Sequence, residues 1–258
     1  MIAGEYQSLE QGQPTTTAKA ESTWAIADVG KVGEFSRDGS PHATDETFNA
    51  GSHLAGTLFS ILGTVILITE ASAQKDPWKI VSFSLYGASL IFLFGSSTLH
   101  HGISGPLEGP LRVLDYMAIY PLIAGTFTPL CLVYYHDDPM GWAFSMTVWG
   151  LAIIFMVLTG VCFQKIPKWL SMTLYICLGW IGAAMTWKLI PALGYNGFGL
   201  FLLGGVLYTA GGYVYTVEAP NPIPGRFGFH EIWHVAVLLA AGCHWVLMYS
   251  IVLPSTPE

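Results

Sequence analysis

The sequence predicts an all-α membrane protein built as a bundle of seven transmembrane helices. Hydrophobic residues make up 52% of the chain and charged residues only 10%, whereas soluble domains carry about 25% charged residues. The mean hydropathy is +0.51, and the apolar residues fall into separate runs of spanning length. These runs do not show the ten-residue alternation of a transmembrane barrel. The sequence therefore favours membrane helices over a soluble core or a barrel.

Seven apolar runs are each close to the ~20 residues that cross the hydrocarbon core of a bilayer. In chain order, the expected spans are residues 53–71, 80–101, 114–135, 142–163, 170–187, 198–217 and 229–253. Short linkers separate them, at residues 72–78, 102–112, 136–141, 164–168, 190–196 and 219–228. Glycine and aromatic residues within the runs are typical of helix packing and of interfacial belts.

Residues 1–45 predict a polar N-terminal tail, and residues 46–258 the seven-helix membrane domain. The first fifty residues contain eight acidic and three basic residues and are rich in Thr, Ser, Gly and Gln. Such a segment buries too little apolar surface to fold alone, so we expect it to be disordered. Residues 1–10 lack a basic start and an apolar stretch, so we expect no cleavable signal peptide. No basic surface indicates a nucleic-acid partner.

Two histidines lie four residues apart at the start of the last run, in Phe229-His230-Glu231-Ile232-Trp233-His234. On a helix they share one face, about one turn (roughly 5–6 Å) apart. This spacing lets both imidazoles reach one metal ion, and zinc favours neutral nitrogen ligands. Placing two such polar side chains at the edge of a membrane span costs free energy, so they are expected there when they have a function. The sequence therefore predicts a metal site within the membrane.

The pattern His-Glu-x-x-His is also the zincin protease signature, in which the glutamate is the general base. The longer metzincin pattern requires Gly and His where this chain has Val237 and Ala240. No aspartate follows Asp138, and the only acidic residue after Glu231 is Glu258. A zinc protease is therefore disfavoured, and the third ligand must come from upstream. We expect Glu231 to stabilise the helix N-terminus rather than to act as a base.

Alternating spans bring the remaining ligand-type side chains to one face of the membrane. The end of the second span and the starts of the third and seventh spans carry His100, His101, Asp115, His230 and His234. Only one of the two adjacent histidines can point into the bundle, because neighbouring residues diverge by about 100° on a helix. Ser97 shares a face with His101, four residues later. The alternative is that these are ordinary interfacial side chains without a metal.

Basic residues near the spans are unevenly divided between the two faces. The side that carries the tail holds Arg37, Arg112, Lys165, Lys168 and Arg226, and the other side holds Lys75, Lys79 and Lys188. Five against three favours a cytoplasmic N-terminus in the plasma (inner) membrane. Seven spans then place the C-terminus outside.

Several motifs together resemble the hemolysin III-related branch of the progestin and adipoQ receptor family. They are Glu46-x-x-Asn49-x-x-x-His53, Ser97-Thr98-Leu99-His100-His101, Leu114-Asp115-Tyr116, Ile123-Ala124-Gly125-Thr126-Phe127-Thr128-Pro129, Pro220-Asn221-Pro222-Ile223-Pro224-Gly225 and Gly228-Phe229-His230-Glu231-Ile232-Trp233-His234. They occur in the family's order and extend over residues 45–253. The resemblance is thus to the whole membrane part, and the tail lies outside it.

The resemblance implies a seven-helix bundle with a zinc ion near the cytoplasmic face, bound by three histidines and a water. It implies that His101, His230 and His234 are the metal ligands. It also implies that Ser97 and Asp115 lie next to these ligands or take part in catalysis. His100 stands where the family often has Tyr or Phe, so His101 is preferred as the ligand. We interpret His53 as a hydrogen-bonded packing residue. His244 lies nearly three turns beyond His234, and we expect it to be structural or lipid-facing.

Two classes of function follow, with a third suggested by the family name. The first is a zinc-dependent hydrolase of lipid amide (ceramide-like) or ester bonds, with membrane lipid as the substrate. Asp115 would accept a proton from the attacking water and pass it to the leaving amine. Ser97 would hydrogen-bond the water or the developing oxyanion. The second class is a non-enzymatic signalling or lipid-homeostasis protein with structural zinc. The third is a membrane-lytic protein, against which the seven apolar spans argue, because a secreted toxin must be soluble.

Overall fold

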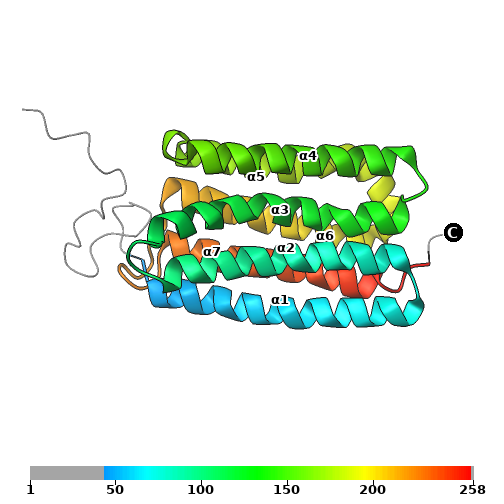
Figure 1. The fold of residues 1–258 in the computed structure, drawn as a ribbon, viewed down its shortest axis with the longest axis horizontal. Coiled ribbons are helices and arrows are strands. Elements are labelled where there is room, and N and C mark those ends of the chain that lie inside the picture. The colour runs from blue at the N-terminus through cyan, green and yellow to red at the C-terminus, as the bar shows by residue number, and fades with distance from the viewer. Residues whose placement is uncertain (1–43, 257–258) are drawn as a thin grey trace, which may run out of the picture.

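The computed structural model describes residues 44–256, and every regular element in that range is a helix. The helices run side by side along the long axis of the molecule (Figure 1). They are α1 Glu46–Gln74, α2 Pro77–Gly102, α3 Glu108–Tyr134, α4 Pro139–Cys162, α5 Lys168–Trp180, α6 Thr186–Val217 and α7 Phe229–Leu247. Short 3-10 helices, Phe163–Lys165 and Ile181–Met185, follow α4 and α5. A π-helical turn, Met248–Val252, continues α7.

Aspartates mark the beginnings of three helices. The carboxylates of Asp45, Asp76 and Asp138 accept a backbone N–H from the first turns of α1, α2 and α4, at 3.0, 2.9 and 2.8 Å. Each bond satisfies a donor that has no partner within the helix. In α2 and α4 the next residue is proline, Pro77 or Pro139, whose missing N–H is not needed in the first turn. Asp-Pro pairs therefore fix where these two helices begin.

The segment from α5 to α6 folds back on itself. The ammonium of Lys168, at its start, lies 3.0 Å from the carboxylate of Glu218, just after its end. Between these points, Trp180 Nε1 donates to Thr209 Oγ1 at 2.9 Å. The pair Lys168 and Glu218 encloses the pair Trp180 and Thr209 in the sequence, so the chain reverses between them and its two arms run antiparallel.

The reversal is centred on Gly194, which interrupts the helical geometry with φ 64° and ψ 171°. A side chain is strained at such a positive φ, and glycine is not. Six helical segments of the described chain are long and apolar enough to span a membrane, the fifth being the 50-residue Lys168–Val217. The number of seven spans stays a prediction, and the fold-back within this segment is the observation that favours it.

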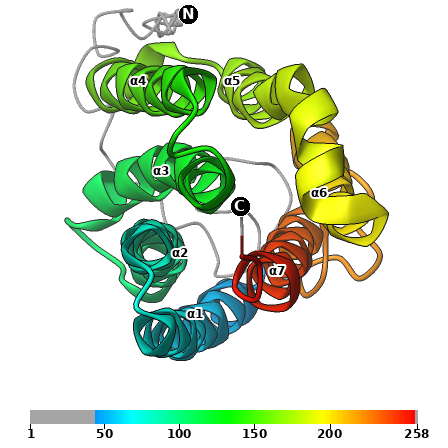
Figure 2. The ribbon, with the colours of Figure 1, turned by 90° about the vertical axis from the view of Figure 1, so that its right-hand side faces the viewer.

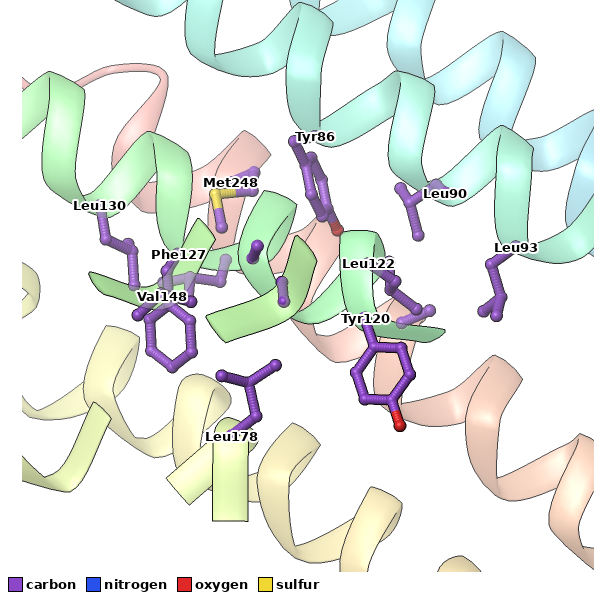
Figure 3. Packing of buried hydrophobic residues seen from close by; sticks show 14 of the residues in the cluster. Tyr86, Leu90, Leu93, Tyr120, Leu122, Phe127, Leu130, Val148, Leu178 and Met248 are labelled. Carbon is purple, nitrogen blue, oxygen red and sulfur yellow. The ribbon is translucent and has the colours of Figure 1, made fainter. Parts of the chain in front are cut away.

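Helix α3 lies inside the bundle and contributes most to the core. Viewed along the helices, α2 lies between α1 and α3, and α7 lies between α1 and α6 (Figure 2). In the most apolar stretch of each helix, 72% of α3 is buried against 17% of α4. The core combines side chains of α3 with side chains from α2, α4, α5 and the π-helical turn (Figure 3): Tyr86, Leu90, Leu93, Tyr120, Leu122, Phe127, Leu130, Val148, Leu178 and Met248.

Large apolar side chains cover the outside of the bundle. Phe59 on α1 is 72% exposed and Val161 on α4 is 78% exposed, and many others on these helices are similar. Soluble monomers rarely expose continuous apolar surfaces of this extent, whereas lipid tails solvate them and helices satisfy their backbone groups internally. The prediction of an all-α, multi-pass membrane protein is confirmed.

The two ends of the described chain lie at opposite ends of the bundle (Figure 1). At one end, the backbone N–H of Asp45 donates to Glu231 of α7 at 2.7 Å. At the other, the buried Lys79 ammonium donates to the carbonyls of Leu253 and Ser255, at 2.8 and 2.6 Å. An odd number of passes produces this arrangement. The predicted tail lies outside the described residues except Thr44 and Asp45, and Asp45 is the N-cap of α1.

Candidate metal centre

Three buried imidazoles meet at the end of the bundle where α1 and α7 begin. His101 lies in the last turn of α2, and His230 and His234 lie in the first turns of α7. Their ring centroids are 4.8 to 5.1 Å apart, and none of the three residues is more than 5% exposed. One ligand nitrogen from each lies within 4.8 Å of the other two. This arrangement fits three ligands of one metal ion, the coordination that leaves a fourth position open in zinc sites.

Glu46, at the start of α1, holds one of these imidazoles in place. Its carboxylate lies 2.6 Å from Nδ1 of His101, and the His101 side chain is only 1% exposed. When Nδ1–H donates to the carboxylate, Nε2 keeps its lone pair for a metal. Carboxylates that bind the second nitrogen of a metal-binding histidine orient the ring and raise its basicity. Three separate helices thus build the histidine cluster.

Ser97 and Asp115 lie beside the cluster, as predicted from the topology. Ser97 is only 2% exposed, and it lines the same cavity as Asp115. Asp115 belongs to a second group of candidate ligands, with His100 and His101, whose ligand atoms lie within 4.8 Å of one another. Both adjacent histidines are buried at the site, at 2% and 3% exposed. The expectation that only one of them points into the bundle is wrong.

Glu231, the glutamate of the His-Glu-x-x-His pattern, joins α7 to α1. One carboxylate oxygen accepts the N–H of Gly228 at 2.8 Å, which forms the N-terminal cap of α7. The other accepts the backbone N–H of Asp45 at 2.7 Å and the amide of Asn49 at 3.3 Å. The residue is fully buried. This confirms the expectation that Glu231 stabilises the helix terminus, and its hydrogen bonds leave it poorly placed to act as a base.

A cavity of about 200 Å³ extends from the histidines into the bundle. Ser97, Asp115, His230 and His234 line one end, and apolar and aromatic side chains form most of the remaining wall. Trp180 and Leu202 also line it, and each is 41% exposed on the outside of the bundle. The cavity therefore extends from the polar site to residues of α5 and α6 that are themselves partly exposed.

Comparison with known proteins identifies the family. Residues 42–245 match the family model described as Haemolysin-III related. The chain belongs to the hemolysin III-related family. It is 34% identical to Hemolysin-3 of Bacillus cereus, over 82% of this chain and 93% of that protein. It is 37% identical to the Hemolysin-3 homolog of Bacillus subtilis (strain 168), over 81% and 96%. Human Monocyte to macrophage differentiation factor is more distant, at 23% over 81% and 85%.

Membership of the hemolysin III-related family confirms the resemblance inferred from the motifs. The matched range includes the predicted ligands and the predicted catalytic residues, and the fold brings all of them to one end of the bundle. A buried histidine cluster that fits a metal ion is therefore a feature of this hemolysin III-related protein. Which metal binds, and what each residue does, stay predictions.

Two contacts of the site, those of Glu46 and His53, were not predicted from the sequence. Two alternatives for His244, structural or lipid-facing, were also left open. Glu46 had no role assigned, although Glu46, Asn49 and His53 have the i, i+3, i+7 spacing of one polar helix face. His53 packs inside the bundle as expected, with its ring stacked on that of His234 at a centroid distance of 3.8 Å. It is not hydrogen-bonded as expected, because neither ring nitrogen has a partner among the described residues. The lipid-facing alternative for His244 is wrong, because this residue is 5% exposed and lines the cavity.

Proposed function

We propose that this hemolysin III-related protein is a zinc-dependent hydrolase of lipid amide or ester bonds. The observation that carries the proposal is the position of a three-histidine cluster, a carboxylate and a hydroxyl at one end of an otherwise apolar cavity. A site of this kind places polar reactive groups beside the headgroup end of a long-chain molecule. We further propose that the protein resides in the plasma membrane, with its N-terminus and this site on the cytoplasmic side.

The residues fit zinc. His101, His230 and His234 supply three buried imidazole nitrogens, and Nδ1 of His234 has no hydrogen-bond partner among the described residues. A buried ring nitrogen without a partner is costly inside a membrane, and a metal ion would relieve that cost. Zinc bound by three imidazoles supplies Lewis acidity, which polarises a carbonyl oxygen and lowers the pKa of water to about 7.

Asp115 is the group of this chain that we assign to proton transfer. It lines the cavity together with Ser97 and His230. A carboxylate in this position accepts a proton from the attacking water and donates it to the leaving amine or alcohol. We assign Ser97, which lines the same cavity, to hydrogen-bonding the attacking water or the developing oxyanion.

The substrate class follows from the walls of the cavity. Apolar and aromatic side chains form most of its surface, and two of them, Trp180 and Leu202, are also partly exposed. A long-chain lipid can enter from the bilayer and leave its acyl chain in this environment without crossing water. Its amide or ester group then lies at the polar end, next to Asp115.

The test is hydrolysis by the purified, zinc-loaded protein, measured as fatty acid released from a ceramide, an ester and a phospholipid. Asp115→Asn should retain its zinc and its thermal stability but lose turnover by about 10²-fold or more. The matched control is Asp137→Asn, because Asp137 has a side chain that is 95% exposed. This control should keep full turnover.

The results separate the candidate functions. Full turnover in Asp115→Asn would assign this residue to structure alone. Absence of hydrolysis of every lipid by zinc-loaded wild type would contradict the proposal and favour a signalling or lipid-homeostasis protein. The name Hemolysin-3, carried by a relative, motivates a lytic activity as a second candidate. Dye leakage from lipid vesicles, unchanged in Asp115→Asn, would favour that candidate.

A further inference from the structure

A second pair of polar side chains lies deep in the cavity, away from the histidine cluster. His244 on α7 and Tyr208 on α6 both line the cavity, and their ring centroids are 5.8 Å apart. His244 is 5% exposed, and the Tyr208 hydroxyl is a buried atom. Neither of these residues has a role in the proposed hydrolysis.

His244 presents a hydrogen-bond acceptor to its surroundings. Its Nε2 lies 3.1 Å from the carbonyl oxygen of Phe201. A carbonyl cannot donate, so Nε2 carries the proton, and Nδ1 of the neutral ring is then an acceptor. Gly204 makes room for the ring, because a Cβ at that position would lie 2.3 Å from Nε2. The packing against α6 therefore fixes the ring and, with it, the position of Nδ1.

Nδ1 of His244 and the hydroxyl of Tyr208, both on residues that line the cavity, have no hydrogen-bond partner among the residues the structure describes. Both are buried in a membrane-spanning bundle, where an unsatisfied polar group costs several kcal/mol. Polar side chains at membrane depth are characteristic of ligand pathways and binding sites. The pair therefore requires a partner with both donor and acceptor capacity, because Nδ1 only accepts.

We propose that His244 and Tyr208 form a second binding subsite, which takes a hydroxyl group on the chain of a long-chain lipid. A hydroxyl donates its proton to Nδ1 of His244 and accepts the proton of Tyr208, whereas a carbonyl or ether can do only the second. The inference rests on the proposed function in one respect, that a lipid occupies the cavity.

The position of the subsite sets where the hydroxyl must be. His234 and His244 are ten residues apart on one helix, which is about 15 Å along its axis. An extended chain advances about 1.2 Å per bond, so this distance corresponds to about twelve bonds. The preferred ligand therefore has its polar headgroup at the histidine cluster and a hydroxyl near the twelfth carbon of its chain.

Competition binding tests the proposal on the full-length protein in lipid nanodiscs. Radiolabelled octadecanoic acid is bound first, and its displacement by 12-hydroxyoctadecanoic acid is measured. The comparison is 2-hydroxyoctadecanoic acid, an isomer of the same composition whose hydroxyl lies beside the headgroup. We expect wild type to bind the 12-hydroxy isomer about tenfold more tightly, equivalent to about 1.4 kcal/mol. Tyr208→Phe, which removes only the hydroxyl, should bring this preference close to one.

The matched control is Tyr213→Phe, the same change on α6 at a residue that is 66% exposed. It should keep the tenfold preference. Equal binding of the two isomers by wild type, or a preference that persists in Tyr208→Phe, would overturn the proposal. Failure of both isomers to displace the label would also overturn it. These fatty acids contain no scissile bond, so the result is independent of hydrolysis, and either proposal can fail while the other stands.

Discussion

Removal of the Glu46 carboxylate should weaken metal binding without removing any metal ligand. Glu46 binds Nδ1 of His101 at 2.6 Å, a distance typical of a short, charge-assisted hydrogen bond. Loss of a hydrogen-bond partner of a metal-binding histidine commonly costs 10- to 100-fold in metal affinity, equivalent to about 1.4 to 2.7 kcal/mol. The Glu46 side chain is 22% exposed, so water partly replaces it, and we expect about 10- to 30-fold for Glu46→Ala.

The assay is zinc competition against a fluorescent chelator in detergent, with thermal unfolding of each variant in parallel. Glu46→Gln keeps an acceptor oxygen but loses the charge, so its loss of affinity should be smaller than that of Glu46→Ala. Glu70→Gln provides the matched control, because Glu70 lies exposed at the other end of α1. Zinc affinity unchanged in Glu46→Ala, together with loss of zinc in His101→Ala, would refute the reasoning.

Three further predictions follow from the same structure. His101→Ala should lose zinc while His100→Ala retains it, measured as metal content, and the reverse result would move the ligand by one residue. Glu231→Ala leaves the N–H groups of Asp45 and Gly228 without their acceptor, so it should destabilise the protein by more than about 2 kcal/mol. An unchanged melting temperature would contradict that role. For topology, cysteines introduced as Glu10→Cys and Thr256→Cys in a cysteine-free background should react with an impermeant reagent in intact cells only at position 256. Labelling of position 10 would reverse the orientation, and labelling of both would refute an odd number of spans.

Composition and hydrophobic run length were sufficient to predict the membrane helices, because spanning length is set by the bilayer and not by tertiary contacts. The convergence of His101, Asp115 and His234 was also predictable, since alternating spans bring those three segments to one face. The predicted linker between the fifth and sixth spans, residues 190–196, contains Gly194, where the helical geometry is interrupted, although helical hydrogen bonds continue on both sides of it.

Side-chain partners across helices were not predictable in the same way. The bond from Glu46 to His101 and the stacking of His53 on His234 depend on the rotation of α1 against α2 and α7. That rotation is set by packing across the whole interface, and it cannot be predicted from a local sequence pattern. The spacing of polar residues on α1 indicates a functional face, but not which histidine each residue contacts.

The metal content of the purified protein tests the central claim most directly. Protein prepared without added metal or chelator should contain about one zinc ion per chain, because three imidazoles and one open position fit this ion. His234→Ala should lose the metal, while His136→Ala, at the opposite end of the bundle, should retain it. Wild type without zinc after incubation with the ion, or a His234→Ala variant that keeps a full equivalent, would contradict the account.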